Sequence, residues 1–271
     1  ALVSTYLLNS RYLNDLVHAV ETDSKTLQRI EFATQQMIDA LSPANFFATN
    51  PEALETILQT QGQSIQKGIV NLLGDLGKGK VSQTDESGFE VGKNLAQTEG
   101  AVVFRNKLFE LIQYKPLTEQ VYERPFLMVP PCINKYYILD LQPDNSVVRY
   151  MVNQGHTVFL VSWKNADASM DRITWDDYVG QGVLEAIRVT QAISQQDKIN
   201  ILGFCVGGTL VSSSLAVLAA RKQEAIASLT LLTTLLDFTD TGILDVFIDV
   251  LTPSNQGLHH LPNMVLCQQS H

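Results

Sequence analysis

The stretch GFCVGGT at residues 203–209 decides how this chain folds. The residues just before it, INIL at 199–202, fit a short buried strand, and residues from about 208 to 221 are rich in Ala, Leu and Ser and fit a helix. Two glycines bracket Cys205 in a G-x-C-x-G pattern, the thiol form of the tight strand-to-helix turn that carries a nucleophile in the G-x-S-x-G motif. The sequence therefore predicts a strand, a sharp turn and a helix, with Cys205 at the turn.

Cys205 has two interpretations. Next to a helix N-terminus, the helix dipole and the free backbone N–H groups favour the thiolate, which is the nucleophilic form of cysteine. The alternative is an inert buried cysteine, because cysteine is one of the most commonly buried residues. The glycine bracket and the strand-to-helix context together favour the nucleophile.

A nucleophile that attacks a carbonyl group also needs hydrogen-bond donors for the oxyanion. The backbone N–H of Val206, directly after the cysteine, is the first candidate. The second donor is expected from the loop PPCIN at residues 130–134, and Asn134 is the candidate there. A Pro-Pro pair can also simply end a strand, so a purely structural loop remains the alternative.

Composition excludes several classes of function. A net charge of −9 over 271 residues argues against general nucleic-acid binding, and an anionic substrate would need local positive charge. Cys132, Cys205 and Cys267 are odd in number and far apart, so neither a disulfide framework nor a zinc site is expected, and a reducing cytoplasm fits. No apolar run reaches the ~18 residues of a transmembrane helix. No metal and no other cofactor is expected.

The first part of the chain reads as helical. Apolar residues recur at helical spacing along residues 8–20, 27–41 and 54–72, and these stripes are expected to be ordinary core. Asn50, followed by a proline, reads as a helix cap. The stretch GDLGKGKV at 74–81 is expected to be a solvated linker, because it lacks the hydroxyl residue and the preceding strand of a P-loop.

From about residue 100 the pattern changes to short strands that alternate with helices. Two apolar runs on either side of residues 105–107 are expected to form a hairpin. The later strand candidates are residues 126–129, 158–162, 199–203 and 228–232. Strands and helices at this spacing predict parallel βαβ units. Antiparallel strands that lead into a parallel sheet, with the nucleophile motif after a late strand, predict an α/β fold of the α/β-hydrolase type.

The choice of cysteine bears on the reaction. A thiolate that attacks an acyl thioester forms another thioester, which is nearly isoenergetic and still activated, whereas a serine would hold the acyl group as a less reactive ester. The cysteine therefore favours acyl transfer over hydrolysis. Hydrolases with a cysteine nucleophile also exist, so a thiol-dependent α/β hydrolase remains the alternative.

Five blocks of the sequence are long enough to be specific. They are FLMVPPCINKYYILDL at 126–141, GHTVFLVSW at 155–163, TWDDYV at 174–179, LGFCVGGT at 202–209 and LTLLTTLLDF at 229–238. Together they resemble the polyhydroxyalkanoate synthases of the class I type. The resemblance implies an enzyme that polymerises (R)-3-hydroxyacyl-CoA into polyhydroxyalkanoate and releases CoA. It also implies that Cys205 forms a covalent thioester and that Val206 and Asn134 shape the oxyanion hole.

The same resemblance implies the partners of the chain. They are the 3-hydroxyacyl-CoA substrate, the growing polyester chain, the surface of the polymer granule and granule-associated proteins, with a homodimer as the active form of the full-length family. Coenzyme A enters as part of the substrate and not as a cofactor. The implied location is the cytoplasm, in association with granules. The helical region, residues 1–95, is expected to serve granule attachment and dimer stability.

The resemblance ends at residue 249. The expected domains are therefore a helical region at 1–95, a partial α/β-hydrolase domain at 96–249 that is incomplete at its C-terminal end, and an unrelated, disordered tail at 250–271, which a shifted reading frame would also explain.

The family's triad Asp and His lie further downstream, so both are expected to be absent from this chain. The order nucleophile, acid, histidine along the chain would still be kept by Asp245 or Asp249 together with His259 or His260. However, too few residues follow the turn at Cys205 to form the strands that would position such an acid and histidine. The chain is therefore expected to be a truncated synthase, inactive by itself. A non-catalytic fragment that binds granules or partners is the other alternative.

Overall fold

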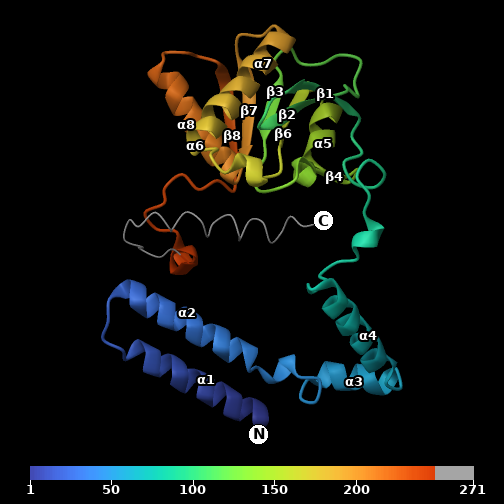
Figure 1. Cartoon of the computed structure of the whole chain (residues 1–271), viewed down its shortest axis with the longest axis vertical. Helices are drawn as coiled ribbons and strands as arrows, with labels where there is room; N and C mark the ends of the chain where they lie inside the picture. Colours follow the sequence, from blue (N-terminus) through green and yellow to red (C-terminus); the bar gives the residue numbers. More distant parts are fainter. Residues whose placement is uncertain (248–271) are drawn as a thin grey trace. The chain divides into compact units, whose positions relative to one another are not determined.

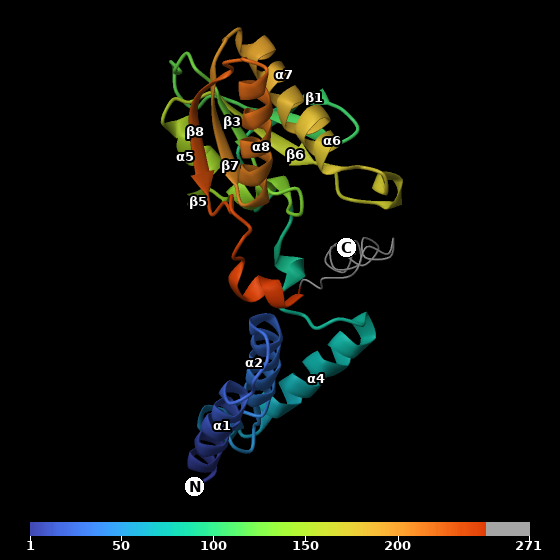
Figure 2. The same cartoon turned by 90° about the vertical axis from the view of Figure 1, so that its left-hand side faces the viewer.

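The chain folds into two compact units. The computed structural model describes residues 1–247, and Figures 1 and 2 show them from two sides. Residues 1–85 together with residues 239–247 form the helical unit, and residues 86–238 form the sheet unit. These limits differ from the expected ones at 95 and 249. The expected tail at 250–271 lies outside the described residues.

Contacts with the second helix place residues 239–247 in the helical unit. The helix α2 spans Ser24–Ala40, and the short 3₁₀ helix η6 spans Gly242–Phe247. The side chain of Gln28 donates a hydrogen bond to the Gly242 carbonyl at 3.2 Å, and the rings of Phe32 and Phe247 meet edge to face at 5.2 Å. This segment, which the sequence assigns to the α/β domain, therefore leaves the sheet unit after β8.

Side-chain caps set the starts of two helices in the helical unit. The other helices here are α1 (Leu2–His18), the 3₁₀ helix η1 (Pro43–Asn45), α3 (Pro51–Gln59) and α4 (Gln63–Lys78). The Asp23 carboxylate caps α2 by accepting from the Thr26 amide at 3.0 Å. Asn50 caps α3, as expected, by accepting from the amides of Glu52 and Ala53.

Two details of the expected helices are wrong. The apolar stripe along 54–72 is not one helix, because the chain turns at Gly62, which adopts a φ of 85° between α3 and α4. The glycine-rich stretch is not wholly a linker either, because α4 continues to Lys78 and ends at Gly79 with a φ of 68°. Both turns fall in the left-handed region that glycine adopts at low cost.

The apolar stripes of the helical unit are mostly exposed. Leu8 is 65% exposed, Tyr12 62% and Leu58 78%, whereas the buried apolar residues among the described part of this unit are Val17 and Ile38. The expectation that these stripes fill an ordinary core is therefore wrong for most of their length. Periodicity predicted that these segments are helical, but it showed neither the break at Gly62 nor whether another element covers the apolar face. No helix in residues 1–247 has the length and hydrophobicity that crossing a membrane requires.

A six-stranded mixed sheet forms the centre of the sheet unit, in the order β1-β2-β6-β3-β7-β8. Its strands are β1 (Gly100–Arg105), β2 (Phe109–Tyr114), β3 (Phe126–Val129), β6 (Val158–Trp163), β7 (Ile199–Phe204) and β8 (Ile226–Leu232). The strand β2 pairs antiparallel with β1 and β6, whereas β6, β3, β7 and β8 are mutually parallel. Every expected strand is present, with bounds shifted by no more than two residues.

The hairpin between β1 and β2 turns on one asparagine. The Asn106 side chain accepts hydrogen bonds from the amides of Leu108 and Phe109 at 2.8 and 3.0 Å, and it donates one to the Gln181 carbonyl at 2.8 Å. Asparagine is favoured in turns because its side chain can bond nearby backbone groups. The residue therefore fixes the expected turn and ties it to the helix that follows β6.

Helices cover both faces of the sheet (Figures 1 and 2). The helix α5 (Val147–Asn153) packs on one face, whereas α6 (Trp175–Asp177), the π-helix η5 (Tyr178–Leu184), α7 (Glu185–Ser194) and α8 (Val206–Ala220) lie on the other. The strand β6 shows the alternation: Val158 and Leu160 face α5, and Phe159 and Val161 face α7 and α8. Both faces of the central strands are therefore buried, as a parallel sheet requires.

Candidate active site: a cysteine on a strained turn

Cys205 lies at the tip of the sharp turn between β7 and α8. Its backbone has φ 53° and ψ −124°, a region that residues other than glycine rarely adopt and that stores on the order of 1–3 kcal/mol of strain. The turn is held on both sides, because the Cys205 amide donates to the Leu232 carbonyl at 2.9 Å and its carbonyl accepts from the Gly208 amide at 2.9 Å. The expected strand, turn and helix are therefore confirmed, and the turn has the geometry of a nucleophile elbow.

Glycines surround the turn because other backbone lies against it. A Cβ atom on Gly207 would overlap the carbonyl oxygen of Val129 and lie 2.7 Å from that of Pro130. A Cβ on Gly203 would overlap the Cα of Gly208, across the turn itself. The end of β3 and the start of α8 can approach this closely only without these side chains. The G-x-C-x-G pattern thus brings the loop after β3 against the elbow.

The two expected oxyanion residues lie in different settings. Val206 is the first residue of α8, where a backbone N–H has no acceptor within the helix. Asn134 is exposed in the turn after β3, and its own amide donates to the Pro131 carbonyl at 3.2 Å. The part of this loop that lies against the elbow is the backbone of Val129 and Pro130. Asn134 could therefore contribute a donor only through its side chain.

A buried tryptophan, which the sequence did not single out, fixes the loop after β3. The Trp163 ring nitrogen donates to the Pro130 carbonyl at 2.8 Å, and its ring meets that of Tyr178 at 5.3 Å. Gly182 allows this packing, since a Cβ there would lie 2.9 Å from the Trp163 ring. The available signal was the tryptophan at the end of an apolar strand, because a buried indole N–H needs an acceptor.

The loop after β8 covers the start of α8. The Thr209 hydroxyl donates to the Leu235 carbonyl at 2.9 Å, and a Cβ on Gly208 would overlap the side chain of Thr234. Exposed apolar side chains follow in the same loop, among them Leu236 and Phe238. Thr234 and Leu235 of this loop therefore lie against the first turn of α8.

The described histidines do not lie at the elbow. His156 precedes β6, where its ring packs against Tyr122 and Phe126 at the end of the parallel strands opposite to Cys205. His18 belongs to the helical unit, where its Nδ1 atom lies 3.2 Å from Glu31. His259 and His260 lie outside the described residues.

The two aspartates considered as the triad acid are not seen near Cys205 either. Asp245 pairs with Lys25 at 3.7 Å within the helical unit, and Asp249 lies outside the described residues. The described acidic candidate thus lies in the helical unit, and His156, the one histidine of residues 86–238, lies at the other end of the parallel strands.

The two described thiols differ in their environment. Burial raises the pKa of the Cys132 thiol, which packs against the main core beside Tyr178. Cys205 lies at the tip of a turn next to a helix N-terminus, although both residues are partly exposed overall. We expect iodoacetamide at neutral pH to modify Cys205 at least ~10-fold faster than Cys132, because the thiolate is the reacting form. Peptide mapping by mass spectrometry after timed quenching measures both rates, and equal rates would contradict the expectation.

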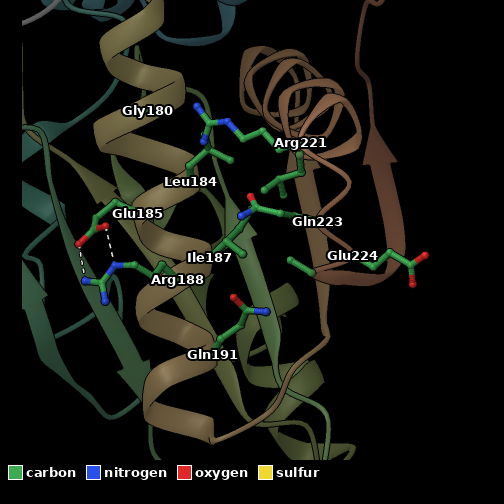
Figure 3. A pocket seen from close by; sticks show the side chains of 11 residues that line it. Gly180, Leu184, Glu185, Ile187, Arg188, Gln191, Arg221, Gln223 and Glu224 are labelled. Atoms are coloured by element: carbon green, nitrogen blue, oxygen red, sulfur yellow. Dashed lines mark hydrogen bonds and ion pairs between the residues drawn. The ribbon is translucent and has the colours of Figure 1, made fainter.

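A cavity of about 700 Å³ lies away from the elbow (Figure 3). Its lining comes from η5 and α7 on one side and from residues 218–225 on the other, next to the start of β7. The carboxylates of Glu185 and Glu224 are already paired, with Arg188 at 2.6 Å and with Lys198 at 2.7 Å. This cavity therefore does not belong to the site around Cys205. Within residues 1–247, no cluster of three or more His, Cys, Asp or Glu side chains could hold a metal ion.

The fold and the elbow together define the class of the protein. A mixed sheet with helices on both faces and a strained nucleophile turn after a central parallel strand is an α/β-hydrolase fold, and residues 127–256 match the family described as alpha/beta hydrolase fold. Residues 1–151 match the family described as poly-beta-hydroxybutyrate polymerase (PhaC) N-terminus. The chain therefore belongs to the poly-beta-hydroxybutyrate polymerase family.

Two curated relatives agree with this assignment. The poly(3-hydroxyalkanoate) polymerase subunit PhaC of Cupriavidus necator is 65% identical over 244 residues, which are 90% of this chain and 41% of that protein. The poly(3-hydroxyalkanoate) polymerase of Methylorubrum extorquens is 44% identical over 250 residues, again 90% of this chain and 41% of that protein. The chain thus spans about two fifths of the length of these relatives.

Among solved structures, one similar protein is MGS-MChE2, an α/β hydrolase from a sediment metagenome of the lagoon of Mar Chica, Morocco. The similarity covers 54% of this chain and 55% of that chain, with 11% sequence identity and a TM-score of 0.36.

Proposed function

We propose that this chain is the part of a polyhydroxyalkanoate polymerase that carries its acyl-accepting nucleophile, Cys205. The observation that carries the proposal is the strained backbone of Cys205 between β7 and α8, at φ 53° and ψ −124°. Strain of this kind persists only where the surrounding structure enforces it, and it exposes the nucleophile at the start of a helix. The substrate in this proposal is a 3-hydroxyacyl-CoA thioester, since the relatives bear the name poly(3-hydroxyalkanoate) polymerase.

The proposed chemistry balances as an exchange of thioesters. The Cys205 sulfur forms a bond to the acyl carbon, the carbon–sulfur bond to coenzyme A breaks, and the proton of the Cys205 thiol passes to the departing CoA thiolate. In the second step the hydroxyl oxygen of another 3-hydroxyacyl unit forms a bond to the acyl carbon, the bond from that carbon to the Cys205 sulfur breaks, and the hydroxyl proton returns through a base to the Cys205 thiolate, so that the polyester grows by one ester bond. The Val206 amide and the Asn134 side chain are the proposed donors to the oxyanion in both steps.

Turnover needs a base, and the described part of the sheet unit has no histidine at the Cys205 end of the strands. His156 lies at the opposite end of the parallel strands, and residues 86–238 contain no other histidine. We expect the purified chain to release at most one CoA per molecule, because the second step depends on deprotonation of the acceptor hydroxyl.

The test is CoA release from 3-hydroxybutyryl-CoA by the purified chain and by Cys205→Ala, with chromatographic detection of CoA and intact-mass detection of an acyl adduct. An adduct on Cys205 with release that stops near one equivalent is the expected result. Sustained release that needs Cys205 would contradict the inactivity of this chain, and free 3-hydroxybutyrate as the product would indicate a thiol-dependent hydrolase. Release that is unchanged in Cys205→Ala would overturn the proposed nucleophile.

A second role rests on the helical unit, whose apolar stripes are exposed along α1 and α4. Exposed apolar surface of this extent commonly serves binding. In this proposal the stripes contact the polyester granule, granule-associated proteins or a second copy of the chain in the cytoplasm. Binding of the chain to polyester particles that persists in Cys205→Ala would support this role, and the absence of binding would contradict it.

A further inference from the structure

Asp140 is a buried carboxylate that joins three segments of the sheet unit. It starts β4 (Asp140–Gln142), directly after the 3₁₀ helix η3 (Tyr136–Leu139), and it is 2% exposed. Its Oδ1 atom accepts from the hydroxyls of Thr98 and Ser146, each at 2.6 Å. Its backbone carbonyl accepts from the Ala96 amide at 3.0 Å. Asp140 lies in the segment between β3 and α5. It thus holds this segment against residues 96–98, which precede β1, and against Ser146, which precedes α5.

Two buried polar atoms of this cluster have no hydrogen-bond partner among residues 1–247. They are the second carboxylate oxygen of Asp140, Oδ2, and the hydroxyl of Tyr114, a residue of β2 that is also 2% exposed. They lie in the same part of the sheet unit, because Tyr114 pairs with Gly100, two residues after the Thr98 that bonds Asp140, and packs in one core cluster with Leu139, the residue before Asp140. Burial and the Asp140 charge raise the pKa of Tyr114. Burial and the same charge also raise the pKa of Tyr136 in η3, which packs against the same core as Tyr114.

The two atoms are complementary in chemistry. A carboxylate oxygen can only accept hydrogen bonds, whereas a phenol hydroxyl can donate one. Each buried polar group left without a hydrogen-bond partner lowers the stability of the folded chain. A single water molecule would accept from Tyr114 and donate to Asp140, and internal waters of this kind commonly bridge two to four buried polar groups. The two atoms form no hydrogen bond with one another, so a direct bond does not satisfy them.

We propose that the Asp140 Oδ2 atom and the Tyr114 hydroxyl bind one internal water molecule, and that this hydrated cluster holds the connection between β3 and α5 in place. The connection begins with the loop at residues 130–134 beside the elbow, and Asp140 fixes its far end. The cluster therefore has a positioning role toward that loop and does not touch the reacting atoms. The inference rests on the buried polar groups and is independent of the proposed reaction.

The test is a double-mutant cycle of unfolding by urea, with Tyr114→Phe, Asp140→Ala and the double variant of the whole chain. Tryptophan fluorescence reports on the sheet unit alone, because both tryptophans, Trp163 and Trp175, lie in it. The matched control is Tyr150→Phe, which removes the same atom from a side chain that is 61% exposed.

We expect Tyr114→Phe to raise the unfolding constant roughly fivefold, as for the loss of one satisfied hydrogen bond, and to change it less than twofold in the Asp140→Ala background. Tyr150→Phe is expected to have no effect. If Tyr114→Phe is as stable as the wild type or more stable, the bound water is excluded, because removal of an unsatisfied hydroxyl should be neutral or stabilising. If Asp140→Ala does not fold, the change in the unfolding constant of Tyr114→Phe alone still tests whether the water is bound.

Two local measurements complete the test. Amide hydrogen exchange over residues 131–139 should become roughly fivefold faster in Tyr114→Phe and stay unchanged in Tyr150→Phe. Unchanged exchange in Tyr114→Phe would overturn the positioning role. A crystal structure of the chain should show a water within ~3.2 Å of both atoms, and a direct bond between Asp140 and Tyr114 would overturn the site.

Discussion

Replacement of Gly207 by alanine is expected to destabilise the sheet unit by more than ~3 kcal/mol, and replacement by valine to prevent its folding. The added Cβ would overlap the Val129 carbonyl oxygen and lie 2.7 Å from that of Pro130. Both atoms are backbone, and Val129 belongs to the central strand β3, so neither can move away without breaking the pairing of β3 with β7.

The matched control for Gly207→Ala is Gly180→Ala. Gly180 lies in η5, and nothing lies within 4 Å of the position of its Cβ, so this variant should fold with an unchanged urea midpoint. Far-ultraviolet circular dichroism and tryptophan fluorescence in urea measure both variants. A Gly207→Ala chain with the wild-type midpoint would show that β3 and α8 do not approach as described.

Substitutions of Cys205 are expected to separate activity from stability. Cys205→Ala and Cys205→Gly should both lose all acylation by 3-hydroxybutyryl-CoA, because neither has a nucleophile. Cys205→Gly should also be about 1–2 kcal/mol more stable than Cys205→Ala, since glycine adopts φ 53° and ψ −124° without the steric cost that a Cβ imposes there.

Urea unfolding of both Cys205 variants measures this difference in the free energy of unfolding. The loss of backbone freedom by glycine on folding opposes the gain by roughly 0.5–1 kcal/mol, which the expected value includes. Equal stability of the two variants would mean that the turn stores no more than about 0.5–1 kcal/mol of strain, and the support for Cys205 as a nucleophile would then rest on the acylation result alone.

Local sequence patterns predicted those features of the sheet unit that are set by residues close together in the sequence. The run at 126–129 is β3 to the residue, and the turn at 105–107 is fixed by Asn106, because strand alternation and turn chemistry act over a few residues. The glycine bracket likewise predicted the elbow, since only glycine permits such close backbone contacts. These features depend on neighbours in the sequence.

The features that the sequence did not predict depend on distant partners. The exposed stripe of α1 has the same periodicity as a buried one, and the position of residues 239–247 depends on contacts with α2. At the site, the bond from Trp163 to the Pro130 carbonyl joins residues 33 positions apart, so no local pattern indicates it. The role of Asn134 remains a prediction.

The order of strands in the sheet has a consequence for biosynthesis. The strand β3 forms hydrogen bonds only with β6 and β7 in this sheet, and both of them follow it along the chain. On the ribosome, the apolar side chains of Leu127, Met128 and Val129 therefore stay without their neighbours until β7 has left the exit tunnel, which takes on the order of ten seconds of translation. During this interval the nascent chain exposes an apolar, aggregation-prone strand, and we expect molecular chaperones to limit its aggregation in the cell.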